Sequence, residues 1–194
     1  MWCIGVGIRS QFLAGSPQSD AARHQRPAAN PELIALDMEV NRPGIENPAW
    51  HDPQDTRIRK SLNVIGIVVH GHAYAYSIPA LSVPTSAASF AELCSFTQRH
   101  VVNHLLGDTA VSVTYCDVAR SVRVLKAEHQ SASLPLGVAG ASRGQIVLSY
   151  DGTWYRQDSA NLPLADHAYE VTYWGDWVSR HPTSRIYLGP DDIK

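Results

Sequence analysis

The sequence predicts a β-rich α+β fold: an antiparallel sheet or partly closed barrel with one main helix and a short helical turn near the C-terminus. After Asn63, short β-branched or alternating runs are separated by Gly, Asp, Asn, Ser and Pro. This rhythm is typical of antiparallel strands joined by turns. Residues 86–106 differ, because their apolar side chains recur at steps of three and four, which is the period of a helix.

The composition favours one domain. The chain has 194 residues, of which 44% are hydrophobic and 18% charged, and a chain of this length forms one core by default. Residues 1–60 are rich in Pro, Gln, Asn, Ser and Arg. We therefore expect an extended, partly mobile N-terminal lead-in over residues 1–60 and a single β-rich domain over residues 61–194.

The first pair of strands is expected over residues 63–69 and 72–78, as a hairpin that turns at His70-Gly71. His70 and His72 could share a face of an extended strand and bind a transition metal. The turn interpretation is favoured, because Gly71 suits a tight hairpin turn and no third ligand accompanies the two imidazoles.

The helix expected over residues 86–106 would end at Gly107, a usual helix stop. The later strands are expected in the segments TAVSVTYC, RSVRVLKA, LPLGVAG, QIVLSY, AYEVTY and SRIYLG. The segment WGDWVSRHP interrupts them and supplies the short helical turn.

Charge and hydropathy exclude two classes of partner. The net charge is −2, which gives no broad cationic field for nucleic acid. No apolar run is long enough for a transmembrane span, because His70 and His72 break the best candidate. The first eight residues are apolar but lack a basic start, so we expect no convincing signal peptide.

The three cysteines, Cys3, Cys94 and Cys116, form no C-x-x-C pair, which excludes a disulfide framework and a four-ligand zinc site. The sequence contains no P-loop, dinucleotide fingerprint or hydrolase elbow. No cofactor is therefore predicted, and a bound metal ion has no supporting set of ligands.

One group of residues could support chemistry. Cys116 ends an expected strand next to Asp117, and His100 and Asn103 lie one helical turn apart on the expected helix. If that helix packs over the end of the sheet, His100 approaches Cys116 and could activate its thiol. The alternative is structural, since single cysteines and histidines commonly serve packing. Aromatic residues beside turns, such as Trp154 and Trp174, are likewise expected in the core.

Several segments follow one another in a familiar order: HVVNHLLGDTAVSVTYCD, LPLGVAG, SYDGTWYRQDS and YWGDWVSRHPTSRIYLG. Over about residues 44–190 this order resembles the uncharacterised bacterial domain-of-unknown-function family 3179. The most specific part is the W-G-x-W-x-x-x-H-P pattern, formed by Trp174, Gly175, Trp177, His181 and Pro182.

The resemblance implies a cell envelope or periplasmic location, because members of the family are commonly exported or anchored. Members typically carry a cysteine at the position of Cys116 and a second one a few residues later. Here Ala119 or Ser121 stands at the second position. This chain is therefore similar to a divergent member that lacks the dithiol needed for metal capture or redox chemistry.

Two hypotheses for function follow. We favour a non-catalytic or degenerate domain that binds a small ligand, a metal or a partner protein through a vestigial site around Cys116. Its binding residues would be Asn103, Asp117, Trp154, Gln157, Trp174 and His181. The alternative is an enzyme with Cys116 as nucleophile and His100 as base.

Overall fold

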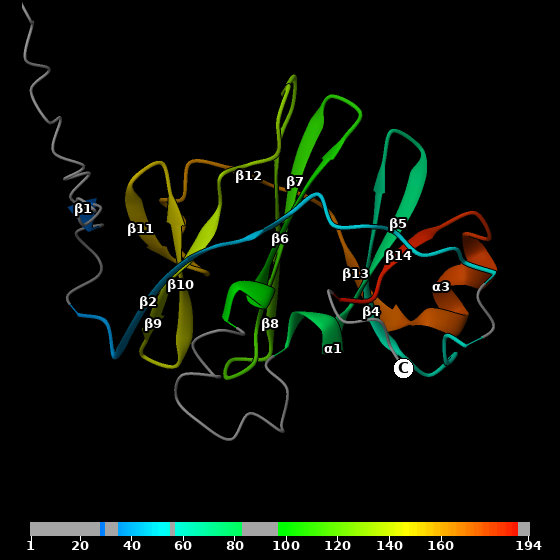
Figure 1. The fold of residues 1–194 in the computed structure, drawn as a ribbon, viewed down its shortest axis with the longest axis horizontal. Helices are drawn as coiled ribbons and strands as arrows, with labels where there is room; N and C mark the ends of the chain where they lie inside the picture. Colours follow the sequence, from blue (N-terminus) through cyan, green and yellow to red (C-terminus); the bar gives the residue numbers. More distant parts are fainter. Residues whose placement is uncertain (1–27, 30–34, 55–56, 83–96, 190–194) are drawn as a thin grey trace, which may run out of the picture.

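The computed structural model describes residues 28–29, 35–54, 57–82 and 97–189. Three open sheets stand in a row, and none closes into a barrel (Figure 1). The β-rich α+β class is therefore confirmed. The expected single antiparallel sheet or partly closed barrel is replaced by three open sheets that are mostly antiparallel, each with one parallel pair. The short helical turn near the C-terminus is also confirmed, because α3 spans Trp174–Arg180.

The sheet at one end of the row, called sheet C, has the strand order β13-β4-β5-β14. Its strands are β4 (Asn63–Val69), β5 (His72–Ser77), β13 (Glu170–Tyr173) and β14 (Arg185–Tyr187). The turn between β4 and β5 has positive φ at both His70 (50°) and Gly71 (77°), as a type I′ hairpin turn requires. The predicted hairpin and its turn are thus confirmed.

The middle sheet, called sheet B, has the order β12-β8-β7-β6-β3. Its strands are β3 (Ile45–Glu46), β6 (Val101–Leu106), β7 (Thr109–Cys116), β8 (Ser121–Ala127) and β12 (Ala165–Asp166). Almost every residue of β7 is buried, because sheet B is covered on both faces.

The predicted main helix is wrong over the part that the structure describes. Residues 86–96 lie outside the described residues, Thr97–His100 form one 3-10 turn (η1), and β6 follows directly. The six residues of β6 pair with β7 in an antiparallel register, so their apolar side chains serve two faces of a sheet. Gly107 has φ of 69°, which suits a hairpin turn as well as a helix end.

The third sheet, called sheet A, has the order β1-β11-β10-β9-β2. Its strands are β1 (Ala28–Ala29), β2 (Met38–Pro43), β9 (Gly137–Ser142), β10 (Gln145–Tyr150) and β11 (Thr153–Arg156). Two-residue turns at Arg143-Gly144 and Asp151-Gly152 join its central strands, again with positive φ at both positions.

Apolar clusters fill the spaces between the sheets. Val113 and Val124 of sheet B pack against Ile65 of sheet C, whereas Leu125 on the other face of sheet B packs against Leu148 of sheet A. Helix α3 covers the outer face of sheet C. A short helix, α1 (Ile78–Leu81), follows β5.

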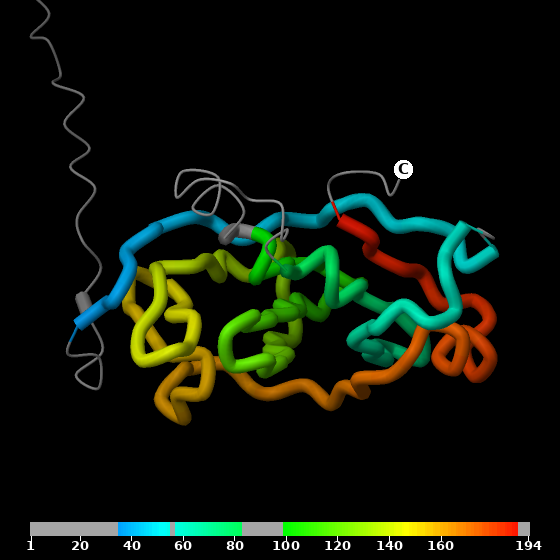
Figure 2. Tube along the Cα trace, turned by 90° about the horizontal axis from the view of Figure 1, so that it is seen from below, coloured from blue at the N-terminus to red at the C-terminus, as the bar shows by residue number. Residues whose placement is uncertain are grey.

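Two extended segments hold the row together along opposite edges (Figure 2). The first pairs through β2 with sheet A and through β3 with sheet B, and it reaches sheet C at a bridge between His51 and Ile186. The second returns through β12 and β13. Residues 38–46 of the lead-in, expected to be extended, therefore contribute strands to two sheets.

Within the described ranges, no helix is long and apolar enough to span a membrane.

Candidate binding site

The W-G-x-W-x-x-x-H-P segment, which includes α3, forms the outer layer of sheet C. The side chains of Trp174 and Trp177 are buried against this sheet, and the Trp177 indole Nε1 donates a hydrogen bond to Ser184 Oγ at 2.8 Å. Gly66 of β4 lies directly beneath the Trp177 ring, where a Cβ atom would overlap the indole. The absence of a side chain at Gly66 therefore lets α3 approach the strand closely.

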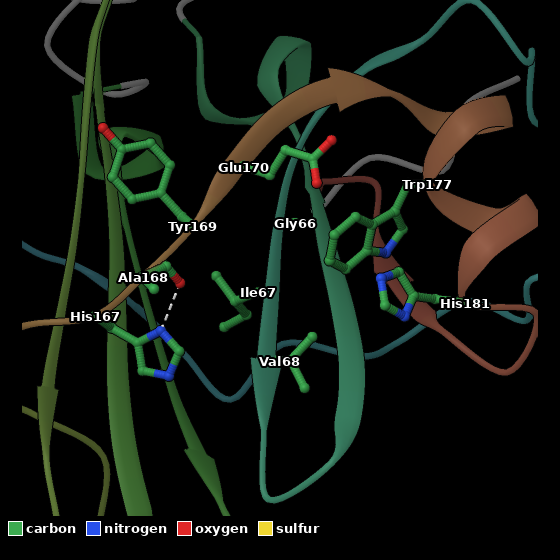
Figure 3. Close-up of a pocket in the computed structure, with 9 residues that line it drawn as sticks. All are labelled: Gly66, Ile67, Val68, His167, Ala168, Tyr169, Glu170, Trp177 and His181. Atoms are coloured by element: carbon green, nitrogen blue, oxygen red, sulfur yellow. Dashed lines mark hydrogen bonds between the residues drawn. The ribbon is translucent and has the colours of Figure 1, made fainter.

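A pocket of about 250 Å³ opens beside this contact, between β4, the start of β13 and α3 (Figure 3). The two strands supply its floor and one wall, and the end of α3 supplies the other wall. Its lining residues are Gly66, Ile67, Val68, His167, Ala168, Tyr169, Glu170, Trp177 and His181. The lining is mostly apolar and aromatic with a few polar groups, and the pocket is shallow and open to solvent.

The carboxylate of Glu170, which lines the pocket, forms an ion pair with Arg180. Glu170 accepts two hydrogen bonds from the Arg180 guanidinium, at 2.6 and 2.9 Å. This bidentate pair lowers the pKa of Glu170. The Arg180 guanidinium also lies over the Trp177 ring, 5.7 Å from its centroid. The ion pair thus fixes the rim of the pocket and leaves little net charge there.

Two imidazoles lie at opposite sides of the pocket (Figure 3). The His181 ring centroid is 4.2 Å from that of Trp177, and the His181 backbone N–H bonds to Trp177 O at the end of α3. The His167 ring donates from Nδ1 to Ala168 O at 2.7 Å. Each ring is held in place by its own local contact, so the walls are preformed.

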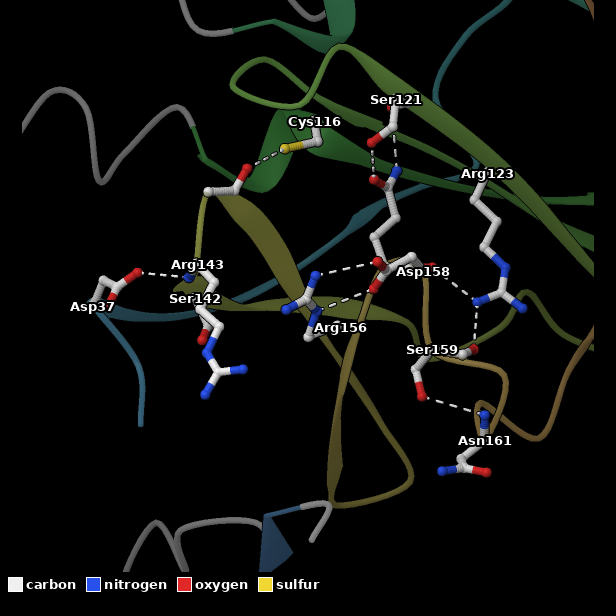
Figure 4. Close-up of polar contacts among 12 residues, drawn as sticks. Asp37, Cys116, Ser121, Arg123, Ser142, Arg143, Arg156, Asp158, Ser159 and Asn161 are labelled. Carbon is white, nitrogen blue, oxygen red and sulfur yellow. Dashed lines mark hydrogen bonds and ion pairs between the residues drawn. The ribbon is translucent and has the colours of Figure 1, made fainter. Parts of the chain in front are cut away.

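Cys116, the centre of the site expected from the sequence, is fully buried. Its sulfur packs in the apolar cluster between sheets B and A. The backbone N–H of Ala119 donates to Sγ at 3.4 Å, and Sγ lies 3.9 Å from Gly144 O (Figure 4). The thiol therefore fills a closed corner of the core. Cys3 and Cys94 lie outside the described residues.

His100 ends the 3-10 turn η1, just before β6. Its Nδ1 donates to the backbone oxygen of Leu81 at 3.0 Å, and Leu81 belongs to the cluster between sheets B and C. Its Nε2 is 3.8 Å from Asp117 Oδ2. Burial lowers the pKa of His100, and Asp117 opposes this shift. The structure thus brings His100 to Asp117, while the Cys116 side chain is sealed in the apolar cluster between sheets B and A.

The other residues expected to bind a ligand make structural contacts. Asn103 is buried, donates to Leu136 O at 2.8 Å and accepts from Ser112 Oγ at 2.6 Å. It thereby joins sheet B to the chain that enters sheet A. Trp154 and Trp174 are buried in the clusters on the outer faces of sheets A and C.

Gln157 bridges the same two sheets. Its Nε2 donates to Thr114 Oγ1 at 2.8 Å and to Ser121 O at 3.3 Å, and its Oε1 accepts from Ser121 Oγ at 2.6 Å. Arg123 reinforces this link by donating from Nη1 to the backbone oxygens of Gln157 and Ser159 (Figure 4). The buried amide therefore acts as a polar connector between β7, β8 and the end of β11.

Of the residues expected from the sequence, only His181 lines the pocket. Gly66, Val68, Tyr169 and Glu170 were missed, because they lie in segments that the sequence identifies only as strands. One signal was available, since an isolated glycine inside a strand indicates a close approach by another group. Gly66 interrupts the β-branched run NVIGIVV in this way.

Comparisons with protein-family models, with curated proteins and with solved structures find no match to this chain. The resemblance to the domain-of-unknown-function family 3179 therefore stays a prediction from motifs. Among the residues that the structure describes, no group of three or more His, Cys, Asp or Glu side chains is gathered around a common point.

Proposed function

We propose that this protein is a non-catalytic binding domain that takes a small, largely apolar ligand group in the pocket between β4, β13 and α3. The observation that carries the proposal is the preformed lining of this pocket. The rings of Trp177 and His181 contact each other at one side, tilted by 41°, and Val68, 43% exposed, contributes apolar surface. The proposal retains His181 from the expected binding set and moves the site away from Cys116.

The surroundings of Cys116 support a binding function rather than the alternative Cys-dependent enzyme. A nucleophilic thiol needs access to substrate and a base within reach. Cys116 has no exposed surface, and the two ring nitrogens of His100 face Leu81 O and the Asp117 carboxylate. These positions favour a role for Cys116 in packing.

A fragment screen observed by NMR on the ¹⁵N-labelled protein tests the proposal. Aromatic and aliphatic fragments should shift the indole N–H resonance of Trp177 and the amide resonances of Val68 and Tyr169. The His181→Ala variant should weaken the binding of these fragments about tenfold, which corresponds to the loss of about 1.4 kcal/mol. His129→Ala is the matched control, because the His129 side chain is 86% exposed and does not line the pocket. Fragments that leave the pocket resonances unchanged would refute the proposal.

A further inference from the structure

The edge of sheet C has a step beside the pocket, which means that β4 extends past the point where its edge partner β13 begins. Strand β4 pairs with β5 from Val64 to Val69, but it pairs with β13 only from Asn63 to Gly66. The chain before β13 turns away to sheet B, where the backbone N–H of His167 donates to Val124 O at 2.8 Å. Within the described part of the chain, residues 67–69 therefore have a neighbouring strand on one side only.

The hairpin turn sets the direction of the backbone groups at this step. Val69 and His72 flank a two-residue turn and pair with each other, so the N–H and C=O of Val69 are directed toward β5. Because these directions alternate along a strand, the N–H and C=O of Val68 are directed toward the side of β13. There they face the step, two residues beyond the pair formed by Gly66 and Glu170.

The pocket provides side-chain contacts at the same place. Ile67 and Val68 line it together with Trp177 and His181, and Val68 is partly exposed (Figure 3). The neighbouring Glu170 carboxylate forms an ion pair with Arg180. Its charge is therefore balanced before an uncharged ligand binds. A free backbone donor and acceptor thus lie beside an apolar surface.

We propose that an extended peptide segment of a partner protein adds to this step as a short strand in line with β13. Its main chain pairs with Val68, and an aliphatic or aromatic side chain packs on Val68 and on the adjoining rings of Trp177 and His181. A peptide is the occupant that supplies both a backbone donor and a backbone acceptor at strand spacing. This inference rests on the proposed function, because it assigns the ligand class of the same pocket.

Hydrogen exchange with a selected peptide tests strand addition directly. Peptides are selected from a random heptapeptide display library on the immobilised full chain, and amide exchange is then measured by NMR with and without the best binder. The Val68 amide should exchange readily in the free protein and at least about tenfold more slowly in the complex. The amides of Ile67 and Val69 should change little, since they already bond to β5.

Two comparisons complete the test. Methylation of single backbone nitrogens along the peptide should abolish binding at one position only, because the step offers one backbone acceptor, Val68 O, to the peptide. Val68→Ser should weaken peptide binding about tenfold, while Val171→Ser should not, since Val171 is similarly exposed on a strand but does not line the pocket.

The outcomes separate this inference from the proposed function. Peptides that shift the pocket resonances but leave Val68 exchange unchanged would overturn strand addition and preserve pocket binding. A library without any binder, when fragments do occupy the pocket, would overturn the peptide as ligand class. Failure of both peptides and fragments to occupy the pocket would overturn the proposed function as well.

Discussion

The Trp177 indole lies against Gly66, in the position that a side chain at residue 66 would need. This contact joins α3 to the middle of sheet C and forms the floor of the pocket. The stability of the outer layer and the shape of the pocket therefore depend on the same pair of residues.

Gly66→Ala should destabilise the protein by about 1 to 3 kcal/mol, because the added methyl group overpacks a buried contact. The measurement is the free energy of unfolding in urea. The same substitution in a Trp177→Leu background is the control, since the smaller side chain makes room for the methyl group. Equal costs in both backgrounds would show that the Gly66–Trp177 contact does not limit the packing.

His104 should make the protein sensitive to acid. Its Nε2 donates to Pro48 O at 3.0 Å, its Nδ1 accepts from Tyr76 Oη at 3.1 Å, and its ring stacks on Trp50 at 4.2 Å. Burial lowers the pKa of His104 from 6.5 to about 4. The unfolded chain therefore binds this proton more readily than the folded protein does, and stability falls as the pH falls from 6.5 toward 4.

The contribution of His104 to this loss should reach about 3 kcal/mol, at 1.36 kcal/mol for each pH unit between the two pKa values. Urea unfolding at pH 7 and at pH 4 measures it. His104→Gln keeps one donor and one acceptor but does not titrate, so it should lose less stability between the two pH values. His129→Gln, at an exposed position, should behave as the unsubstituted protein. An unchanged pH dependence in His104→Gln would contradict the assignment.

Gln157→Ala should cost about 2 to 3 kcal/mol, because it removes the partner of Thr114 and Ser121 in a buried network. Gln130→Ala is the control, since the Gln130 amide makes only an exposed hydrogen bond and should change stability by less than about 0.5 kcal/mol. Chemical denaturation compares the two variants. Similar stabilities would argue against a structural role for Gln157 and would restore it as a candidate binding residue.

Cys116 should resist alkylation in the folded protein, because its side chain is fully buried. Iodoacetamide labelling followed by peptide mapping distinguishes Cys116 from the other two cysteines. The rate at Cys116 should rise at least about a hundredfold in denaturant, where the thiol is exposed. Rapid labelling of Cys116 under native conditions would instead support the enzyme hypothesis.

The sequence predicts those parts of the fold that are specified locally. The hairpin at His70-Gly71 and the turn of α3 both depend on neighbouring residues, and both are present. The strand β6 could not be recognised in the same way. Its segment VVNHLL fits a helical period, and only pairing with β7 along its whole length makes it a strand.

The candidate site was harder to predict for the same reason. The pocket joins residues that are far apart in the sequence, such as Val68 and His181, and their proximity depends on the return of the chain through β13. The sequence also suggested that Cys116 and His100 share a corner. In the structure His100 ends a single 3-10 turn before β6 and faces Leu81 O and Asp117, whereas the Cys116 side chain is buried in the core.

The central claim is that binding occurs at the pocket of sheet C and not around Cys116. Titration of one fragment or peptide into His181→Ala, Cys116→Ala and the unsubstituted protein tests it most directly. The affinity should fall about tenfold in His181→Ala and stay unchanged in Cys116→Ala. A loss of affinity in Cys116→Ala, with His181→Ala unaffected, would contradict the claim.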